Sequence, residues 1–281
     1  MRLALLLCLL AGPALAEVPK VVTDIPPVSA LVAQVMGELG KPEMLLEKCG
    51  DEHDMQLRPS QMRHIASAGL IVWVGPQLTP GLAEAIAASR QPSLALLDAP
   101  QTARRDYAGG GVNPHAWLDP ANAQAWLGLI SGELSRIDPD HAETYRANAA
   151  KADADIAAMN AAITGRLTGM RPFVTYHDAY GYFAAAYGLP YQGGLAAGDA
   201  APPGAARIAA LHDQAAQGTI GCIFPEVQHD PALIDSIAQG TPVKIGPALD
   251  PVGSSLDPGP LAYEQLMTAL ADSLSVCADN P

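Results

Sequence analysis

Beyond its first residues, the sequence lacks any uninterrupted apolar run long enough to cross a bilayer, which takes a helix of about 20 residues. It is also short of positive charge, with 16 Lys and Arg against 29 Asp and Glu and a net charge of −13. Nucleic acid and anionic membranes are poor partners for such a surface, whereas a cation is a natural ligand. Internal repeats are absent as well, so solenoids and propellers are excluded.

The one apolar run stands at the N-terminus. It follows Arg2, is closed by Gly12-Pro13, and precedes Ala14-Leu15-Ala16, a small-x-small cleavage site. We interpret residues 1–16 as a cleaved secretory signal peptide and expect a soluble mature protein that starts near Glu17. Cys8 lies inside this run without the small residues that precede a lipidated cysteine, which argues against a lipid anchor.

Three cysteines remain after the signal peptide, in a compartment where pairing is expected. We predict a disulfide between Cys222 and Cys277, because the first lies in a strand-like run and the second ends the last helical segment. Cys49 is then a free thiol.

Apolar runs and amphipathic segments alternate along the 281 residues, of which 49% are hydrophobic. Such alternation predicts parallel α/β sheets. Strands are expected at 20–25, 70–75, 172–176, 222–224 and 243–245, and helices at 29–39, 80–89, 205–217, 231–239 and 261–276.

Between these two sets, residues 140 to 167 are rich in alanine and free of Pro and Gly until Gly165. They predict one long helix that joins two lobes rigidly. The expected organisation is an N-terminal α/β lobe at 17–138, a connecting helix at 139–168 and a C-terminal α/β lobe at 169–281.

Three of the seven histidines stand at strand ends or in tight loops, where open α/β sheets place their ligands: His53, His115 and His177. Asp250 follows another predicted strand. Three imidazoles and a carboxylate form a borderline-soft, tetrahedral ligand set that suits Zn²⁺ better than Mn²⁺ or Mg²⁺. Their separations of 62 residues or more mean that only tertiary structure can bring them together.

The other histidines have different settings. His64, His141 and His212 fall in helical stretches beside charged neighbours and are expected on solvated faces. His229, in Val227-Gln228-His229-Asp230, is left open between a functional and a surface role.

Several segments, taken together and in order, closely resemble ZnuA-type zinc-binding proteins, the periplasmic solute-binding components of ABC importers. They are Glu52-His53-Asp54 with Leu57-Arg58-Pro59-Ser60, Val72-Trp73-Val74-Gly75-Pro76, His115-Ala116-Trp117-Leu118, Tyr176-His177-Asp178-Ala179-Tyr180, Phe224-Pro225-Glu226-Val227-Gln228 and Leu249-Asp250-Pro251-Val252-Gly253.

The resemblance implies two α/β lobes joined by a long helix, with Zn²⁺ held in the cleft by His53, His115 and His177. Asp250 matches a position where many relatives supply a carboxylate, although Glu52 or water can take the fourth place. The resemblance also implies the Cys222–Cys277 disulfide, a periplasmic location, and high-affinity capture of zinc for an ABC transporter permease. We expect the protein to be a monomer. The sequence departs from the family at 106–113, where this short segment replaces the long His- and Asp-rich loop of many relatives.

Three other functions are less consistent with the sequence. A manganese-binding relative is disfavoured because such proteins usually have a carboxylate where His177 stands. A zinc hydrolase using Glu52 or Glu226 as base is disfavoured because no His-Glu-x-x-His or nucleophile-elbow pattern occurs, so we expect no enzyme. A surface adhesin of related fold would need the lipid anchor that Cys8 does not predict.

Overall fold

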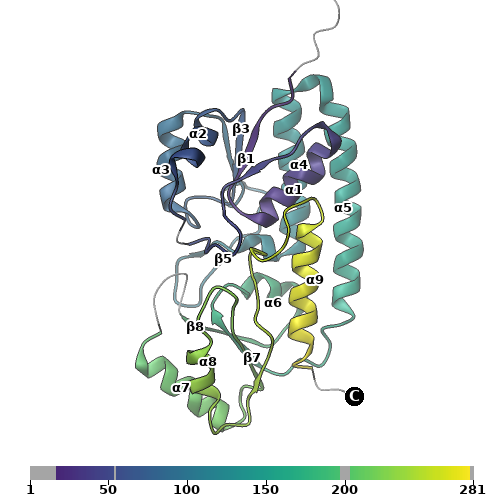
Figure 1. Cartoon of the computed structure of the whole chain (residues 1–281). Helices are drawn as coiled ribbons and strands as arrows, with labels where there is room; N and C mark the ends of the chain where they lie inside the picture. The colour runs from purple at the N-terminus through teal and green to yellow at the C-terminus, as the bar shows by residue number, and fades with distance from the viewer. Residues whose placement is uncertain (1–16, 54, 197–202, 279–281) are drawn as a thin grey trace, which may run out of the picture.

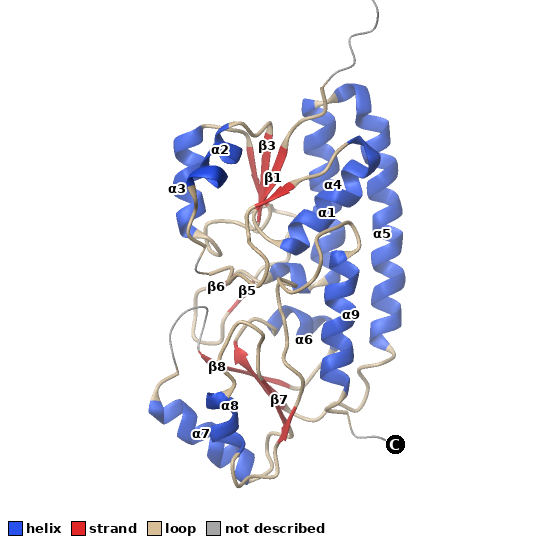
Figure 2. Cartoon of the chain, in the orientation of Figure 1, coloured by secondary structure: helices blue, strands red, loops and turns tan. Residues whose placement is uncertain are grey.

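The computed structural model describes residues 17–53, 55–196 and 203–278 (Figure 1). The predicted signal peptide, with Cys8, lies outside the described residues. No helix in the described ranges is long and apolar enough to span a membrane. Two separate parallel sheets, one above the other in Figure 2, confirm the predicted pair of α/β lobes.

The N-terminal sheet has the strand order β2-β1-β3-β4, and all its pairs are parallel. Its central strands are apolar and fully buried, as expected for a sheet covered on both faces. The strands are β1 (Val21–Thr23), β2 (Glu43–Met44), β3 (Leu70–Trp73) and β4 (Ser93–Ala95).

Helices α1 (Pro26–Met36), α2 (Pro59–Ala66) and α3 (Pro80–Ser89) accompany this sheet. The helix predicted at 80–89 is confirmed at both ends. Helix α1 begins three residues before the predicted start, because Pro26 stands at the first helical positions instead of ending the preceding segment. Proline suits that place, since its fixed φ is helical and its missing N–H has no partner there anyway.

Two long helices pack against each other, and the second of them reaches from the N-terminal lobe to α9 (Ala262–Ser275) of the C-terminal lobe. Helix α4 (Pro120–Ile137) escaped the sequence prediction, although Asp119 caps it by accepting a hydrogen bond from the Ala121 amide and Pro120 starts it. Helix α5 (Ala142–Thr164) is the predicted connector and, with 23 residues, is about 34 Å long. In Figure 1 it runs along both lobes. The predicted lobe boundaries at 138 and 168 lie just outside it and stay a prediction.

The C-terminal sheet has the order β10-β9-β7-β8, again all parallel. The strands and helices predicted for this lobe are present, with ends shifted by one or two residues. The elements are β7 (Phe173–His177), α6 (Gly181–Tyr187), β8 (Tyr191–Ala196), α7 (Ala205–Ala216), β9 (Cys222–Phe224), α8 (Ala232–Ala238), β10 (Lys244–Ile245) and α9 (Ala262–Ser275). The predicted disulfide links Cys222 of β9 to Cys277 beyond α9.

The lobes are packed against each other and not merely tethered. Helix α9 of the C-terminal lobe contacts α1 and α5. A single cluster of contacting buried residues includes side chains from both lobes and from the helices between them. The Trp117 indole N–H donates to the Pro251 carbonyl at 2.9 Å, and the Tyr263 hydroxyl donates to the Trp117 carbonyl at 3.0 Å. A rigid relation between the lobes follows.

Short elements complete the cleft side. The short segment at 106–113 lies within the hairpin of β5 (Arg105–Asp106) and β6 (Val112–Asn113). Gly110 and Gly111 have φ values of 90° and 86°, which residues other than glycine rarely adopt. The 3₁₀ turns are η1 (Gly37–Leu39), η2 (Ala116–Leu118) and η3 (Pro139–His141).

Candidate metal centre

The three predicted histidines converge in the structure. The ring centroids of His53 and His115 are 5.3 Å apart, those of His53 and His177 5.6 Å, and those of His115 and His177 5.2 Å. His53 comes from the loop after β2, His115 from the turn before η2, and His177 from the last position of β7. The three side chains are 0 to 10% exposed, so the group is buried where segments of the two lobes meet.

Asn113 orients the His115 ring. The side-chain oxygen of Asn113, Oδ1, lies 2.9 Å from Nδ1 of His115 and also accepts the His115 backbone N–H at 3.0 Å. The amide nitrogen of Asn113 donates to the Asp178 carbonyl, which fixes which end of the amide faces the ring. An amide oxygen only accepts, so Nδ1 of His115 carries a proton and Nε2 presents its lone pair.

Glu226 orients the His177 ring in the same way. One oxygen of this fully buried carboxylate lies 2.5 Å from Nδ1 of His177, and the other accepts the His177 backbone N–H at 3.4 Å. Nδ1 therefore donates and Nε2 of His177 faces inward. Such a carboxylate makes the imidazole a stronger metal ligand.

The two inward nitrogens, Nε2 of His115 and Nε2 of His177, are 3.3 Å apart. Two lone pairs at this distance repel each other unless a proton or a metal ion lies between them. Two nitrogen ligands of tetrahedral Zn²⁺, each about 2.05 Å from the ion, are themselves about 3.3 Å apart. The spacing therefore already fits a zinc ion. Burial and the neighbouring rings of His177 and His53 lower the pKa of His115 well below its usual range, which keeps it available as a neutral ligand.

Glu52 is the fourth member of this group. One carboxylate oxygen of Glu52 and one ring nitrogen of each of the three histidines all lie within 4.8 Å of one another. The nearest carboxylate oxygen is 3.8 Å from Nε2 of His53, and the side chain is 3% exposed. Burial raises the pKa of Glu52 to about 8, against the lowering effect of His177. In the metal-free protein this carboxyl is therefore largely protonated at pH 7.

Asp250 is not brought into this group. One of its oxygens accepts the Ser254 backbone N–H at 3.1 Å and faces the Gln228 amide at 3.2 Å, and the other accepts from the Ser255 hydroxyl at 2.6 Å. It therefore caps the turn at 250–255, while the carboxylate among the imidazoles is that of Glu52.

The remaining histidines lie elsewhere. His64 pairs with Glu43, His141 with Asp138, and His212 is close to Asp213, all at least partly exposed. His229 is different, because its Nε2 is 3.7 Å from the Glu226 carboxylate and its ring stacks on Tyr176. Burial lowers the pKa of His229, and the charge of Glu226 partly offsets this.

Sequence reasoning missed the roles of Asn113 and Glu226 toward the imidazoles. Asn113 stands two residues before His115, a spacing at which a side chain often bonds the backbone of its neighbour, so a local signal existed. Glu226 lies 49 residues from His177, and the sequence suggests for it only the disfavoured role of a hydrolytic base. Nothing in the sequence pairs it with that ring.

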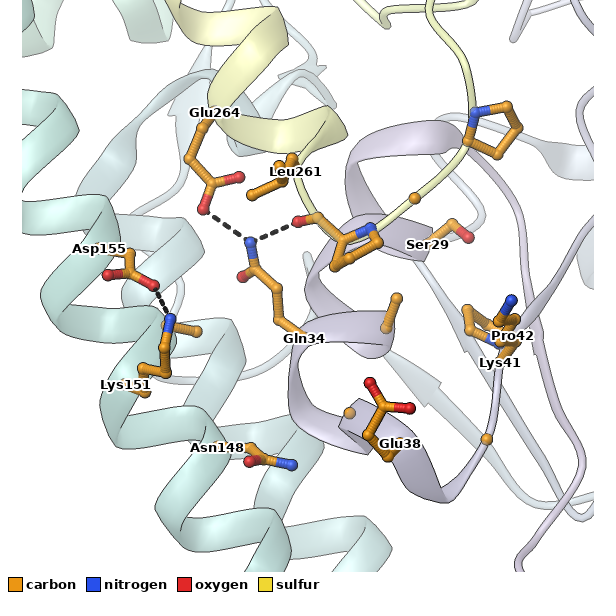
Figure 3. A pocket seen from close by; sticks show the side chains of 17 residues that line it. Ser29, Gln34, Glu38, Lys41, Pro42, Asn148, Lys151, Asp155, Leu261 and Glu264 are labelled. Carbon is orange, nitrogen blue, oxygen red and sulfur yellow. Dashed lines mark hydrogen bonds and ion pairs between the residues drawn. The ribbon is translucent and has the colours of Figure 1, made fainter.

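A pocket of about 870 Å³ lies at another place, between α1, α5 and the segment before α9 (Figure 3). There the Gln34 amide donates to the Pro260 carbonyl and to the Glu264 carboxylate, both at 2.7 Å. Lys151 is engaged by Asp155 on the same helix. The pocket contains no histidine, and its polar groups tie the two lobes together on the helical side.

Comparison with known proteins supports this picture. A family described as "Zinc-uptake complex component A periplasmic", ZnuA, matches residues 21–277. The high-affinity zinc uptake system protein ZnuA of Paracoccus denitrificans is 46% identical, covering 95% of this chain and 94% of its own. That of Brucella abortus is 30% identical, covering 92% and 91%. The periplasmic zinc-binding protein TroA of Treponema pallidum superposes with a TM-score of 0.82 at 20% identity, covering 93% and 99%, which shows the fold.

Proposed function

The chain belongs to the ZnuA family of periplasmic zinc-uptake components, and we propose that it binds Zn²⁺ through His53, His115 and His177. Members of this family are solute-binding proteins and not enzymes, so zinc is cargo: it is captured in the periplasm and delivered to the permease of an ABC importer.

One observation carries the choice of ligands. The lone pairs of His115 and His177 face each other at 3.3 Å, and both rings are held in this orientation by acceptors at their Nδ1 atoms. A site built in this way is preorganised for a tetrahedral ion. It also supports zinc over the manganese alternative, because all three ring nitrogens are ligands that zinc favours over oxygen-preferring ions.

We propose Glu52, and not Asp250, as the fourth ligand. Its oxygen is already within reach of the three imidazoles, whereas the oxygens of Asp250 are engaged by Ser254, Ser255 and Gln228. Because burial keeps the Glu52 carboxyl protonated near pH 7, zinc binding displaces its proton.

We further propose that the protein acts as a monomer and that residues 1–16 direct its export and are then removed. Release to the permease is proposed to rely on local movement of the loop that carries His53. The interlobe contacts of Gln34, Trp117 and Tyr263 oppose a large opening of the lobes.

A competitive zinc titration of the metal-stripped protein tests the proposal. His177→Ala is expected to weaken binding by a factor of at least about 100, since one of the ligands is lost. His212→Ala, an exposed histidine on α7, is the matched control and is expected to bind as the unaltered chain does. Equal affinities for all three proteins would refute the proposed ligand set.

A further inference from the structure

A second group of potential ligands lies directly behind the first. His177, Glu226 and His229 each offer a ligand atom, and these atoms lie within 4.8 Å of one another. The His177 ring belongs to both groups, because its Nε2 faces His115 and its Nδ1 faces Glu226. The ring centroids of His177 and His229 are 6.2 Å apart.

The His229 ring is held in place. It stacks on Tyr176 with centroids 4.0 Å apart and an angle of 14° between the planes. Its Nε2 is 3.7 Å from the Glu226 oxygen that also contacts His177. This separation is too long for a hydrogen bond and leaves the ring nitrogen facing a carboxylate across a gap.

The His229 position is also reachable. Its side chain is 29% exposed, compared with 7% for His177 and 0% for Glu226. From the other lobe, Asp51 is close enough for its charge to act on His229, while one Asp51 oxygen accepts the His53 backbone N–H at 2.8 Å. Carboxylates from both lobes therefore make this edge of the cleft attractive to a cation.

We propose that Glu226 and His229 form a second, outer zinc position next to the buried three-histidine site. Two protein ligands leave the rest of the coordination shell to water, so this position is weaker than the inner one and exchanges faster. An arriving ion is held there by Glu226 and His229, next to the His177 ring that Glu226 also contacts. The outer position is thus a place of entry to the cleft.

The shared carboxylate links the two positions. Glu226 accepts the Nδ1 proton of His177, and an ion at the outer position draws on the same oxygen. It therefore makes His177 a weaker ligand for the inner ion, and by linkage the inner ion weakens the outer one by the same factor. The inference rests on the proposed inner site only through this shared ring.

The test is a zinc titration of the full metal-stripped chain against a series of chelators. The unaltered protein is expected to bind one tight and one weaker equivalent. His229→Phe keeps an aromatic ring on Tyr176 but removes the nitrogen, and it should lose the weaker equivalent while changing the tight dissociation constant less than about threefold. His212→Phe is the matched control and should keep both.

His115→Ala separates this inference from the proposed function. It should lose the tight equivalent and keep the weaker one, and retention of the tight equivalent would refute the inner site alone. The outer position is refuted if the unaltered chain binds a single equivalent, if His229→Phe keeps two, or if His229→Phe loses the tight equivalent. His229→Gln, checked for folding in the metal-free state, repeats the measurement with a different side chain.

Discussion

Replacing Glu226 by glutamine tests how much the buried carboxylate contributes to zinc binding. Glutamine has the same shape and still offers an oxygen to Nδ1 of His177, but it removes the negative charge at the 2.5 Å contact. Loss of such a partner typically lowers metal affinity 10- to 100-fold, or by about 1.4 to 2.7 kcal/mol. Because the side chain is fully buried, little of this effect is screened by water.

A chelator competition at pH 7.5 measures this loss directly. The matched control is Glu264→Gln, which removes the same charge from a partly buried carboxylate that contacts Gln34 and no histidine. Its zinc affinity should equal that of the unaltered chain. Unfolding of each metal-free protein by urea separates an effect on binding from one on folding. If Glu226→Gln binds zinc within a factor of about two of the unaltered chain, the carboxylate does not tune the His177 ring as argued.

Three further perturbations have expected outcomes. Because burial raises the pKa of Glu52 to about 8, zinc binding at pH 7 should release about one proton more from the unaltered chain than from Glu52→Gln. The number of protons released is measured from the binding enthalpies in buffers of different ionisation heat, and equal release from the two proteins would contradict the prediction. Burial likewise raises the pKa of Asp24 from 3.8 to about 7. A raised carboxyl pKa stabilises the fold at low pH and loses that contribution as pH rises through 7, so urea unfolding of the metal-stripped chain between pH 5 and pH 8 should show a steeper decline than Asp24→Asn does. Replacing Cys222 and Cys277 together by alanine should lower the free energy of unfolding by about 4 kcal/mol, given the 55-residue separation, with little change in zinc affinity; an unchanged urea midpoint would contradict the chain-entropy estimate.

Much of the fold follows from local sequence signals. The buried strands β1, β3 and β7 and the helix α3 were predictable because apolar runs and amphipathic spacing depend only on neighbours along the chain. Helix α4 was missed although its capping residue Asp119 and its initial Pro120 are local signals as well. The contact of α9 with α1 depends on residues more than 200 positions apart, as the Gln34–Glu264 hydrogen bond shows. The spacing of apolar residues along the chain does not predict such a contact.

The candidate site was predictable where it depends on residue type and not where it depends on packing. His53, His115 and His177 stand out as imidazoles at strand ends and turns. The choice between Glu52 and Asp250 was not decidable from position, since both follow strand-like segments. It depends on competing partners: the backbone N–H groups and hydroxyls at 254–255 engage Asp250, whereas Glu52 is buried beside His53.

The same packing constrains how cargo leaves. A hinge that opened the lobes would have to break the Trp117–Pro251 and Tyr263–Trp117 bonds and expose the core shared by α1, α5 and α9. Even 400 Å² of newly exposed apolar surface would cost about 10 kcal/mol, which is comparable to the stability of a whole domain. His53 lies instead in the segment between β2 and α2, whose described residues, 45–53 and 55–58, form neither helix nor strand. Displacing this loop withdraws Glu52 and His53 together and leaves the imidazoles of His115 and His177, without opening the core shared by α1, α5 and α9, so loop displacement is the less costly route in the proposed release.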